Sequence, residues 1–394
     1  MIMLIGLVMF ILVGIVLYIS KGSVKKASQQ NAKKTQSAVS ENQPIKEFVA
    51  GCVDKLAKDA LVMIGQQGGY IYTNQGGTLI NLKDSDEGLF FIKNQNIKIA
   101  YNIKNPSLKT PLPYFRSLPE YPLKNFPYKN LPCAKSNPNM EFRGIFGVST
   151  MPYLNPSGGP HSMQTQIETF IDSNLGSCLD FSAFKARGYE IEILKSKTKV
   201  TIGSSDISVA SEIPIKAKNT ATNEILDLKD FSATLNVRLK DLYYFVKELV
   251  ENDVQDITFD MEDSKNSKDS FYVKVAENAY KNDDLVIVRD EKSLVYGQPL
   301  EYAFARQNRF PALYCIDNSN LEFTEDHLIT KEDLLGDSEL KAEDPDEDAI
   351  TFDAQALLPN PSLPAKLTQP YTQFKVSASD GEYTDYQIIT VKKI

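Results

Sequence analysis

From Tyr189 onward, apolar residues of this chain recur at every second position. The segments YEIEI (189–193), ISVASEIPIKA (207–217) and SFYVKV (270–275) show this alternation, and clusters of turn-forming residues separate them. A period of two is typical of a strand that buries one face. The sequence therefore predicts strands over most of the chain after Tyr189.

Three segments have helical spacing instead. Apolar residues repeat at intervals of three and four over residues 44–69, 166–181 and 232–252, which is typical of amphipathic helices. We expect the third helix to cover one face of the sheet, so residues 44–308 are predicted to form an α+β body. Eight prolines between residues 106 and 138 predict an extended segment within it.

The first twenty residues contain no charged side chain. As a helix they would span roughly 30 Å, the thickness of the hydrocarbon core of a bilayer. The sequence therefore predicts a single transmembrane anchor over residues 1–20, with the membrane as a partner. Residues 21–43 are polar and are predicted to form a stalk.

The orientation of the predicted anchor rests on two opposed signals. Five lysines without any acidic residue follow it: Lys21, Lys25, Lys26, Lys33 and Lys34. The positive-inside rule would keep the rest of the chain in the cytoplasm. Four cysteines favour the opposite orientation, because disulfides are common in exported domains. We expect a location at the cell membrane with the bulk of the chain extracellular.

The cysteines are Cys52, Cys133, Cys178 and Cys315, and no two are close enough for a Cys-x-x-Cys motif. Cys52 and Cys178 lie on the apolar faces of two similar predicted helices, which could pack side by side. We therefore predict a disulfide between them, which leaves Cys133 to pair with Cys315. The alternative is four buried free thiols in a cytoplasmic body.

Composition bears on the class of function. The formal net charge of −8 argues against a nucleic-acid partner. There are two histidines, His161 and His327, and the motifs of zinc proteases, phosphate-binding loops and nucleophile elbows are absent from the sequence. The chain is therefore predicted not to be an enzyme, although a carboxylate pair could still hydrolyse glycosides.

An acidic stretch, AEDPDEDAITFDA (342–354), places Asp344, Asp346 and Asp348 at alternate positions. Alternate aspartates in a loop can converge on calcium, which prefers several oxygen ligands. An EF-hand is excluded, because Ala349 and Gln355 stand where that loop requires glycine and glutamate. A calcium loop and a plain acidic turn before a strand both remain open.

The Asp-Pro-Asp-x-Asp turn at 344–348, the strand residues 350–352 and the later Ala378-x-Asp380-Gly381 turn resemble the cadherin-like, dystroglycan-type repeats of surface proteins. This resemblance implies a β-sandwich over residues 309–394. It also implies calcium as a cofactor, with Asp344, Asp346, Asp348 and Asp380 as candidate ligands. The anchor and body resemble pilin-like, membrane-anchored envelope proteins of archaea, which implies no activity.

The predicted fold class is a membrane-anchored multidomain chain with a single N-terminal transmembrane helix, an α+β body and a C-terminal all-β cadherin-like (Ig-like) sandwich. The predicted function is non-catalytic: adhesion or structural assembly at the cell surface, associated with a pilus and stabilised by calcium. Its partner is expected to be a surface protein, an envelope polymer or a second copy of the chain. An anchored envelope hydrolase and a cytoplasm-facing membrane scaffold are the alternatives.

Overall fold

The computed structural model describes residues 43–79, 91–94, 97–104, 147–257, 259–313, 321–335, 342–357 and 363–394. The chain divides into two compact units, each assembled from separate stretches. The described part of the first unit comprises residues 43–55, 175–197 and 210–233, and the second contains the other described residues. The domain boundaries predicted from the sequence remain predictions.

Strand β6 (Ile207–Asn219), most of which belongs to the first unit, is central to a four-stranded sheet. It pairs with β4 (Tyr189–Ile193), with β5 (Lys197–Ile202) and with β7 (Ile225–Leu235). The pairing with β4 is antiparallel and sets Ile191 opposite Ala217. Alternate residues of β6 are buried, as the period of two predicted.

Helical segments of the first unit are joined covalently. The helix over residues 43–66 carries Cys52, and α3 (Met163–Cys178) ends at Cys178. These cysteines form a disulfide with a Cα–Cα distance of 5.8 Å, which confirms the predicted pairing. Beside it, the ring of Phe48 packs against Phe181 and Phe184, the latter in α4 (Ser182–Lys185), at centroid distances of 5.4 and 5.5 Å. Cys133 and Cys315 lie outside the described residues.

The largest sheet belongs to the second unit and has the strand order β1-β2-β10-β9-β8, with β3 paired to β2. The strands of this sheet are β1 (Phe91–Asn94), β2 (Ile97–Lys104), β10 (Gln298–Arg306), β9 (Asp283–Val295), β8 (Phe271–Tyr280) and β3 (Val148–Ser149). β2 and β10 run parallel, and β8, β9 and β10 are antiparallel neighbours. Tyr296 and Gly297, both with positive φ, make the two-residue turn between β9 and β10 that such hairpins favour.

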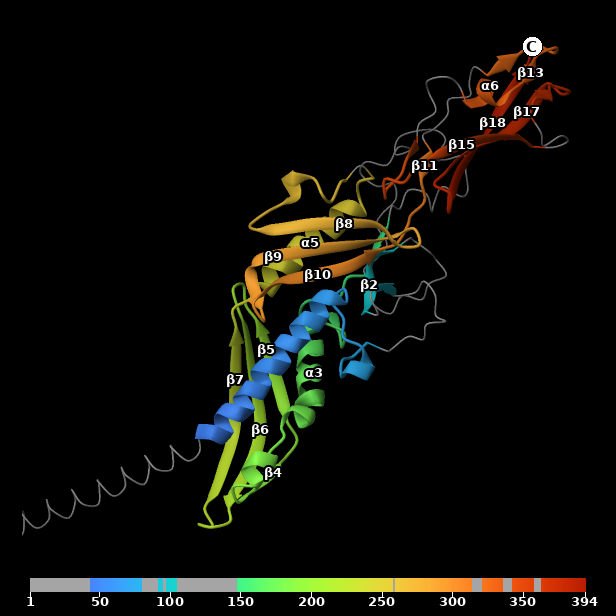
Figure 1. Ribbon diagram of the computed structural model, residues 1–394. Helices are drawn as coiled ribbons and strands as arrows, with labels where there is room; N and C mark the ends of the chain where they lie inside the picture. The colour runs from blue at the N-terminus through green and yellow to red at the C-terminus, as the bar shows by residue number, and fades with distance from the viewer. Residues whose placement is uncertain are drawn as a thin grey trace, which may run out of the picture. The chain divides into compact units, whose positions relative to one another are not determined.

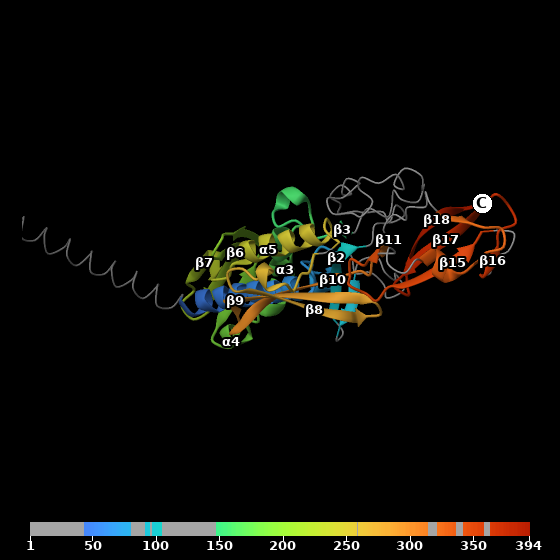
Figure 2. The same ribbon diagram turned by 90° about the horizontal axis from the view of Figure 1, so that it is seen from above.

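Helix α5 (Leu239–Asp253) packs against this sheet (Figures 1 and 2). The ring of Phe245 stacks on Phe271 of β8 at 4.9 Å, while Asp241 and Glu248 face solvent. The predicted helix began too early, because residues 232–235 belong to β7. Phe231, Ala233 and Leu235 are buried alternately there, so the period of two overrides the four-residue spacing of Leu235 and Leu239.

The C-terminal module, defined here as the described residues from 312 to 394, has a sheet of order β12-β18-β17-β15 (Figure 1). These strands span Glu322–Phe323, Thr384–Lys393, Tyr371–Ser379 and Thr351–Ala356. Two small antiparallel pairs, β11–β14 and β13–β16, accompany it together with helix α6. These elements are β11 (Ala312–Leu313), β14 (Ala342–Glu343), β13 (Leu328–Ile329), β16 (Ala365–Lys366) and α6 (Lys331–Leu335).

One apolar core holds the module together. Phe374, Val376 and Ala378 of β17 and Ile389 and Val391 of β18 are at most 1% exposed, as the sequence predicted. Side chains from β11, β13, α6, β15 and β16 complete this cluster. Among the described residues outside the module, short 3-10 turns at Thr73–Gln75, Pro156–Gly158 and Ser264–Asn266 connect elements.

The predicted fold class requires a correction. Among the described residues, no helix combines the length and apolar character needed to cross a membrane. Residues 1–20, where the transmembrane helix was predicted, lie outside those residues. Helix α5 is amphipathic and buries one face, and the described part of the chain is β-rich with few helices. The described residues therefore do not support the predicted single transmembrane helix.

Candidate functional site

Two buried arginines lie where the large sheet meets the C-terminal module. Arg306 is the last residue of β10, and Arg309 lies in the segment before β11. Their exposed fractions are 5% and 1%. A buried guanidinium is costly unless carboxylates pair with it, so the groups around these arginines define the site.

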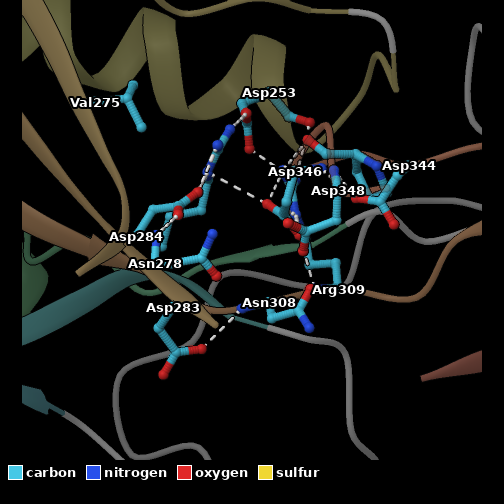
Figure 3. A network of polar contacts seen from close by, with 12 residues as sticks. Asp253, Val275, Asn278, Asp283, Asp284, Asn308, Arg309, Asp344, Asp346 and Asp348 are labelled. Carbon is cyan, nitrogen blue, oxygen red and sulfur yellow. Dashed lines mark hydrogen bonds and ion pairs between the residues drawn. The ribbon is translucent and has the colours of Figure 1, made fainter. Parts of the chain in front are cut away.

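Arg309 joins α5 to the acidic turn of the C-terminal module (Figure 3). Its Nη1 donates to Asp253 Oδ2 at 2.7 Å, at the end of α5. Its Nε and Nη2 donate to Asp346 Oδ1 at 3.0 and 2.8 Å, and its backbone N–H donates to Asp346 Oδ2 at 2.7 Å. Nη2 also donates to the carbonyl of Pro345 at 2.7 Å. One side chain therefore binds two elements far apart in sequence.

Arg306 shares the same carboxylates and adds a third. It donates to Asp253 Oδ1 at 3.1 Å and to Asp284 Oδ2 at 2.6 Å, and it forms an ion pair with Asp346 Oδ1 at 3.2 Å. Burial would lower the pKa of Arg306, but the charges of Asp253, Asp346 and Asp284 outweigh it and raise that pKa. Both guanidinium groups are therefore charged, and we call these five residues the Arg–Asp network.

Asp344 lies in the same turn as Asp346 but has a different role. Asp344 Oδ1 accepts the backbone N–H groups of Asp346 and Asp348 at 2.8 and 3.3 Å, which is the local bonding that shapes aspartate turns. Its other oxygen, Oδ2, is buried and has no hydrogen-bond partner among the described residues. Burial raises the pKa of Asp344 to about 7. Burial, followed by the charge of Asp346, raises the pKa of Asp348 to about 6.

Asp380 lies in a different turn of the module. Its Oδ1 accepts the N–H groups of Glu382 and Tyr383 at 2.7 and 2.6 Å, and its Oδ2 accepts from Asn308 Nδ2 at 3.3 Å. Glu382 Oε2 accepts from Asn308 and from Asn282 at 3.2 and 2.8 Å. This turn therefore forms a second set of polar contacts with the large sheet and the segment that follows it.

The four predicted calcium ligands thus have different surroundings. Asp346 is saturated by arginine, and both oxygens of Asp380 accept protein donors. The oxygens left for a cation belong to Asp344 and Asp348. Within the described ranges, no group of three or more His, Cys, Asp or Glu side chains is arranged to hold a metal ion. An ion at this turn would therefore need further oxygen ligands, such as water.

Sequence reasoning missed Asp253, Asp284, Arg306 and Arg309. The available signal was the pair of arginines in ARQNRF (305–310), directly ahead of an acidic region. The local sequence does not indicate which carboxylates pair with these arginines, because the partner aspartates lie 22 to 56 residues away in the chain.

The comparisons with known proteins add little at this point. No protein-family model matches the chain, and no curated protein matches its sequence. A solved structure that it is similar to is Drosophila N-cadherin EC1–3, with 9% identity, a TM-score of 0.17, and coverage of 52% of this chain and 89% of that chain. This weak likeness is compatible with the cadherin-like resemblance and carries no further weight. No comparison supports the resemblance to archaeal pilin-like proteins.

The raised pKa values predict a pH dependence of stability. Since the pKa of Asp344 is about 7 in the folded state and about 4 in an unfolded chain, folding binds a proton. The stabilising contribution is complete below the unfolded value and is lost as the pH rises through the folded value. We expect the melting temperature in calcium-free buffer to fall as the pH rises from about 5 to about 8.

The variant Asp344→Asn should weaken this dependence and be more stable than the parent at about pH 8, by on the order of 2–4 kcal/mol. The amide keeps the acceptor of the turn and cannot ionise. Thermal and urea unfolding across the pH series measure both effects. Asp326→Asn is the control, because the Asp326 side chain is 96% exposed. Equal pH profiles for the parent and Asp344→Asn would contradict the assignment to this carboxyl group.

Proposed function

We propose that this chain is a non-catalytic surface protein that serves in adhesion or structural assembly. The observation that carries the proposal is the Arg–Asp network. Arg309 and Arg306 bind carboxylates from α5, from β9 and from the turn of the C-terminal module. Separating these elements would leave buried charges without partners, which costs several kcal/mol. The junction is therefore suited to transmit a pulling force rather than to hinge.

The Cys52–Cys178 disulfide supports a location outside the cytoplasm, because such bonds persist in oxidising compartments. Labelling of intact cells with a membrane-impermeant maleimide tests this location, in a background with Cys133 and Cys315 replaced by serine. We expect labelling only after reductant. Thiols that become reactive without reductant, and only after lysis, would support the cytoplasm-facing scaffold instead.

The adhesion role predicts that the chain binds a partner and keeps it under load. Beads coated with the full chain are tested for clustering with each other and for retention on fragments of the cell envelope under flow. We expect at least one of these interactions. Arg309→Met should weaken retention under flow more than static binding, because its effect is on the rigidity of the junction. Absence of both clustering and retention would overturn the proposal.

Calcium is the cofactor that we include in this proposal, held by Asp344 and Asp348. Support comes from the buried, unpaired Oδ2 of Asp344 and from the raised pKa values of both carboxyl groups. A bound cation would give Oδ2 a partner and would stabilise both groups in their ionised form. At a calcium concentration of about 100 times Kd, stability should rise by about 2.7 kcal/mol.

Melting temperatures with calcium and with chelator measure this effect. The rise should be absent from Asp344→Asn combined with Asp348→Asn and present in the Asp326→Asn control. No shift in the parent chain would remove calcium from the proposal and leave the adhesion role to the bead assay.

A carboxylate-based envelope hydrolase is the second candidate. The observation that favours it is the presence of two neighbouring carboxyl groups with raised pKa values, Asp344 and Asp348, since glycosidases use such pairs. Against it, Asp344 is only 7% exposed. Release of soluble sugars from envelope polymers, lost in Asp348→Asn, would favour the hydrolase over the adhesion protein.

A further inference from the structure

Strand β7 (Ile225–Leu235) lies at an edge of its sheet (Figure 1). Among the described residues, β6 is the one strand that pairs with it. A strand with a single neighbour presents a row of backbone N–H and C=O groups along its other side, and these groups can pair with a further strand. Ile225, at the start of β7, is 66% exposed, so this end of the strand is open to solvent.

Side chains in the first half of β7 alternate between the two faces of the sheet. Leu226 and Leu228 are partly buried on one face. Asp227 and Lys229 are exposed on the other. Lys229 pairs with Glu212 of β6 at 2.9 Å, and the two side chains are 59% and 50% exposed. Since an ammonium group has three donors, Lys229 is able to bind a second carboxylate.

Antiparallel pairing of two β7 strands about a two-fold axis at Leu228 brings opposite charges together. In an antiparallel pair, positions equally far from the centre stand opposite each other. Asp227 of each copy then faces Lys229 of the other, and Leu228 faces itself. Because a two-fold interface repeats each contact, the pairing contains two ion pairs on either side of one leucine pair. Opposite charges that face each other across strands stabilise a sheet.

The other strands that pair with β6 do not offer such an edge. In β4, the same antiparallel self-pairing about Ile191 would set Glu190 against Glu192, and like charges directly opposite each other are destabilising. In β5, the N–H groups of Thr198 and Val200 already donate to carboxylates of α3, at 3.1 and 2.9 Å. The charge pattern therefore favours β7 as the edge that meets a second copy.

We propose that two copies of this chain associate by antiparallel pairing of their β7 strands, with the pairs between Asp227 and Lys229 fixing the register. The partner is a second copy because these charges are complementary to their own antiparallel image. The inference rests on the proposed role in assembly and names its partner. Chains that stay monomeric and are still retained on envelope fragments would overturn the self-pairing and leave the adhesion role standing.

The test measures association of the full chain by sedimentation velocity over a concentration series. One strand pairing is small compared with a standard interface, so we expect half of the chains to be dimeric at about 10–100 μM. Asp227→Lys and Lys229→Asp each place like charges opposite each other twice, so each should weaken the dimer about tenfold. An equal mixture of the two variants should regain the association of the parent, because both pairs of opposite charges are restored between the two chains.

Lys199→Asp is the matched control. It is the same charge reversal at an exposed position of β5, whose edge is bound by α3, so it should associate like the parent. A parent chain that is monomeric at about 100 μM would overturn the proposal. Single variants that associate like the parent, or a mixture without recovery, would also overturn it. Species larger than a dimer that persist in Asp227→Lys would point instead to pairing of β7 with a different strand of the next copy.

A cysteine at the two-fold axis tests the geometry directly, in a background with Cys133→Ser and Cys315→Ser. Leu228→Cys should form covalent dimers under mild oxidation. Residues that face each other in an antiparallel pair have Cα atoms about 4.5–5.5 Å apart, which a disulfide can span. Ser232→Cys is the control at an exposed position of the same strand, because it would stand opposite residue 224 of the second copy and should stay monomeric. Equal crosslinking of the two variants would contradict the proposed register.

Discussion

Replacing Arg309 by methionine is expected to lower the free energy of unfolding by about 3–5 kcal/mol. Methionine fills much of the space of the arginine stem but leaves Asp253 and Asp346, each at most 5% exposed, with less positive charge. Arg306 is then the one arginine of the network left to pair with the carboxylates of Asp253, Asp284 and Asp346. Urea unfolding near neutral pH measures the loss.

Arg289→Met is the matched control, because it is the same chemical change at an exposed arginine of strand β9. Arg289 pairs with Glu301 at 2.7 Å, but the side chain is 50% exposed, so its removal should cost no more than about 1 kcal/mol. Combining Arg309→Met with Asp346→Asn should cost less than the sum of the two single changes, because both remove the same interaction. Equal losses for Arg309→Met and Arg289→Met would contradict a structural role of the network.

The strands of the C-terminal module could be predicted from the sequence because their signal is local. Phe374, Val376 and Ala378 alternate with polar residues, and the structure buries all three. Which face of such a strand is buried depends on the strand's own alternating residues and on a core with room for them. The helix over residues 43–66 was predictable for the same reason, since its buried residues repeat at three and four.

The Arg–Asp network could not be predicted in this way. The regular spacing of Asp344, Asp346 and Asp348 suggested a shared ion, yet the structure binds Asp346 to two arginines and uses Asp344 to shape the turn. A buried carboxylate can be satisfied by a metal ion, an arginine or backbone N–H groups. The local sequence does not distinguish these cases, because the arginines come from another part of the chain.

The structure also shows where the charges of the acidic stretch over residues 342–354 lie. From the sequence alone, this stretch could be a calcium loop or a plain acidic turn. In the structure, Asp344 and Asp346 are 7% and 5% exposed, so part of that charge is buried at a junction. Burial raises the pKa of Asp344, and this is why stability should depend on pH near neutrality.

Removing the Cys52–Cys178 disulfide is the second change with a large expected effect. The bond closes a loop with a sequence separation of 126 residues, for which the chain-entropy model gives about 5 kcal/mol, within an observed range of about 2–5 kcal/mol for native disulfides. The double variant Cys52→Ala and Cys178→Ala should lose this stability in urea unfolding. Alanine is preferred to serine because Cys52 is 5% exposed, and a buried hydroxyl would add a separate cost.

Three comparisons separate the bond from the side chains. Each single alanine variant should be about as unstable as the double variant, because either change removes the same bond and the effects do not add. Reductant should lower the unfolding midpoint of the parent chain much more than that of the double variant. Phe48, which packs beside the bond against Phe181, provides the packing control, since Phe48→Ala should destabilise the chain and leave its response to reductant intact. An unchanged midpoint in the double variant would show that the loop is held by packing alone.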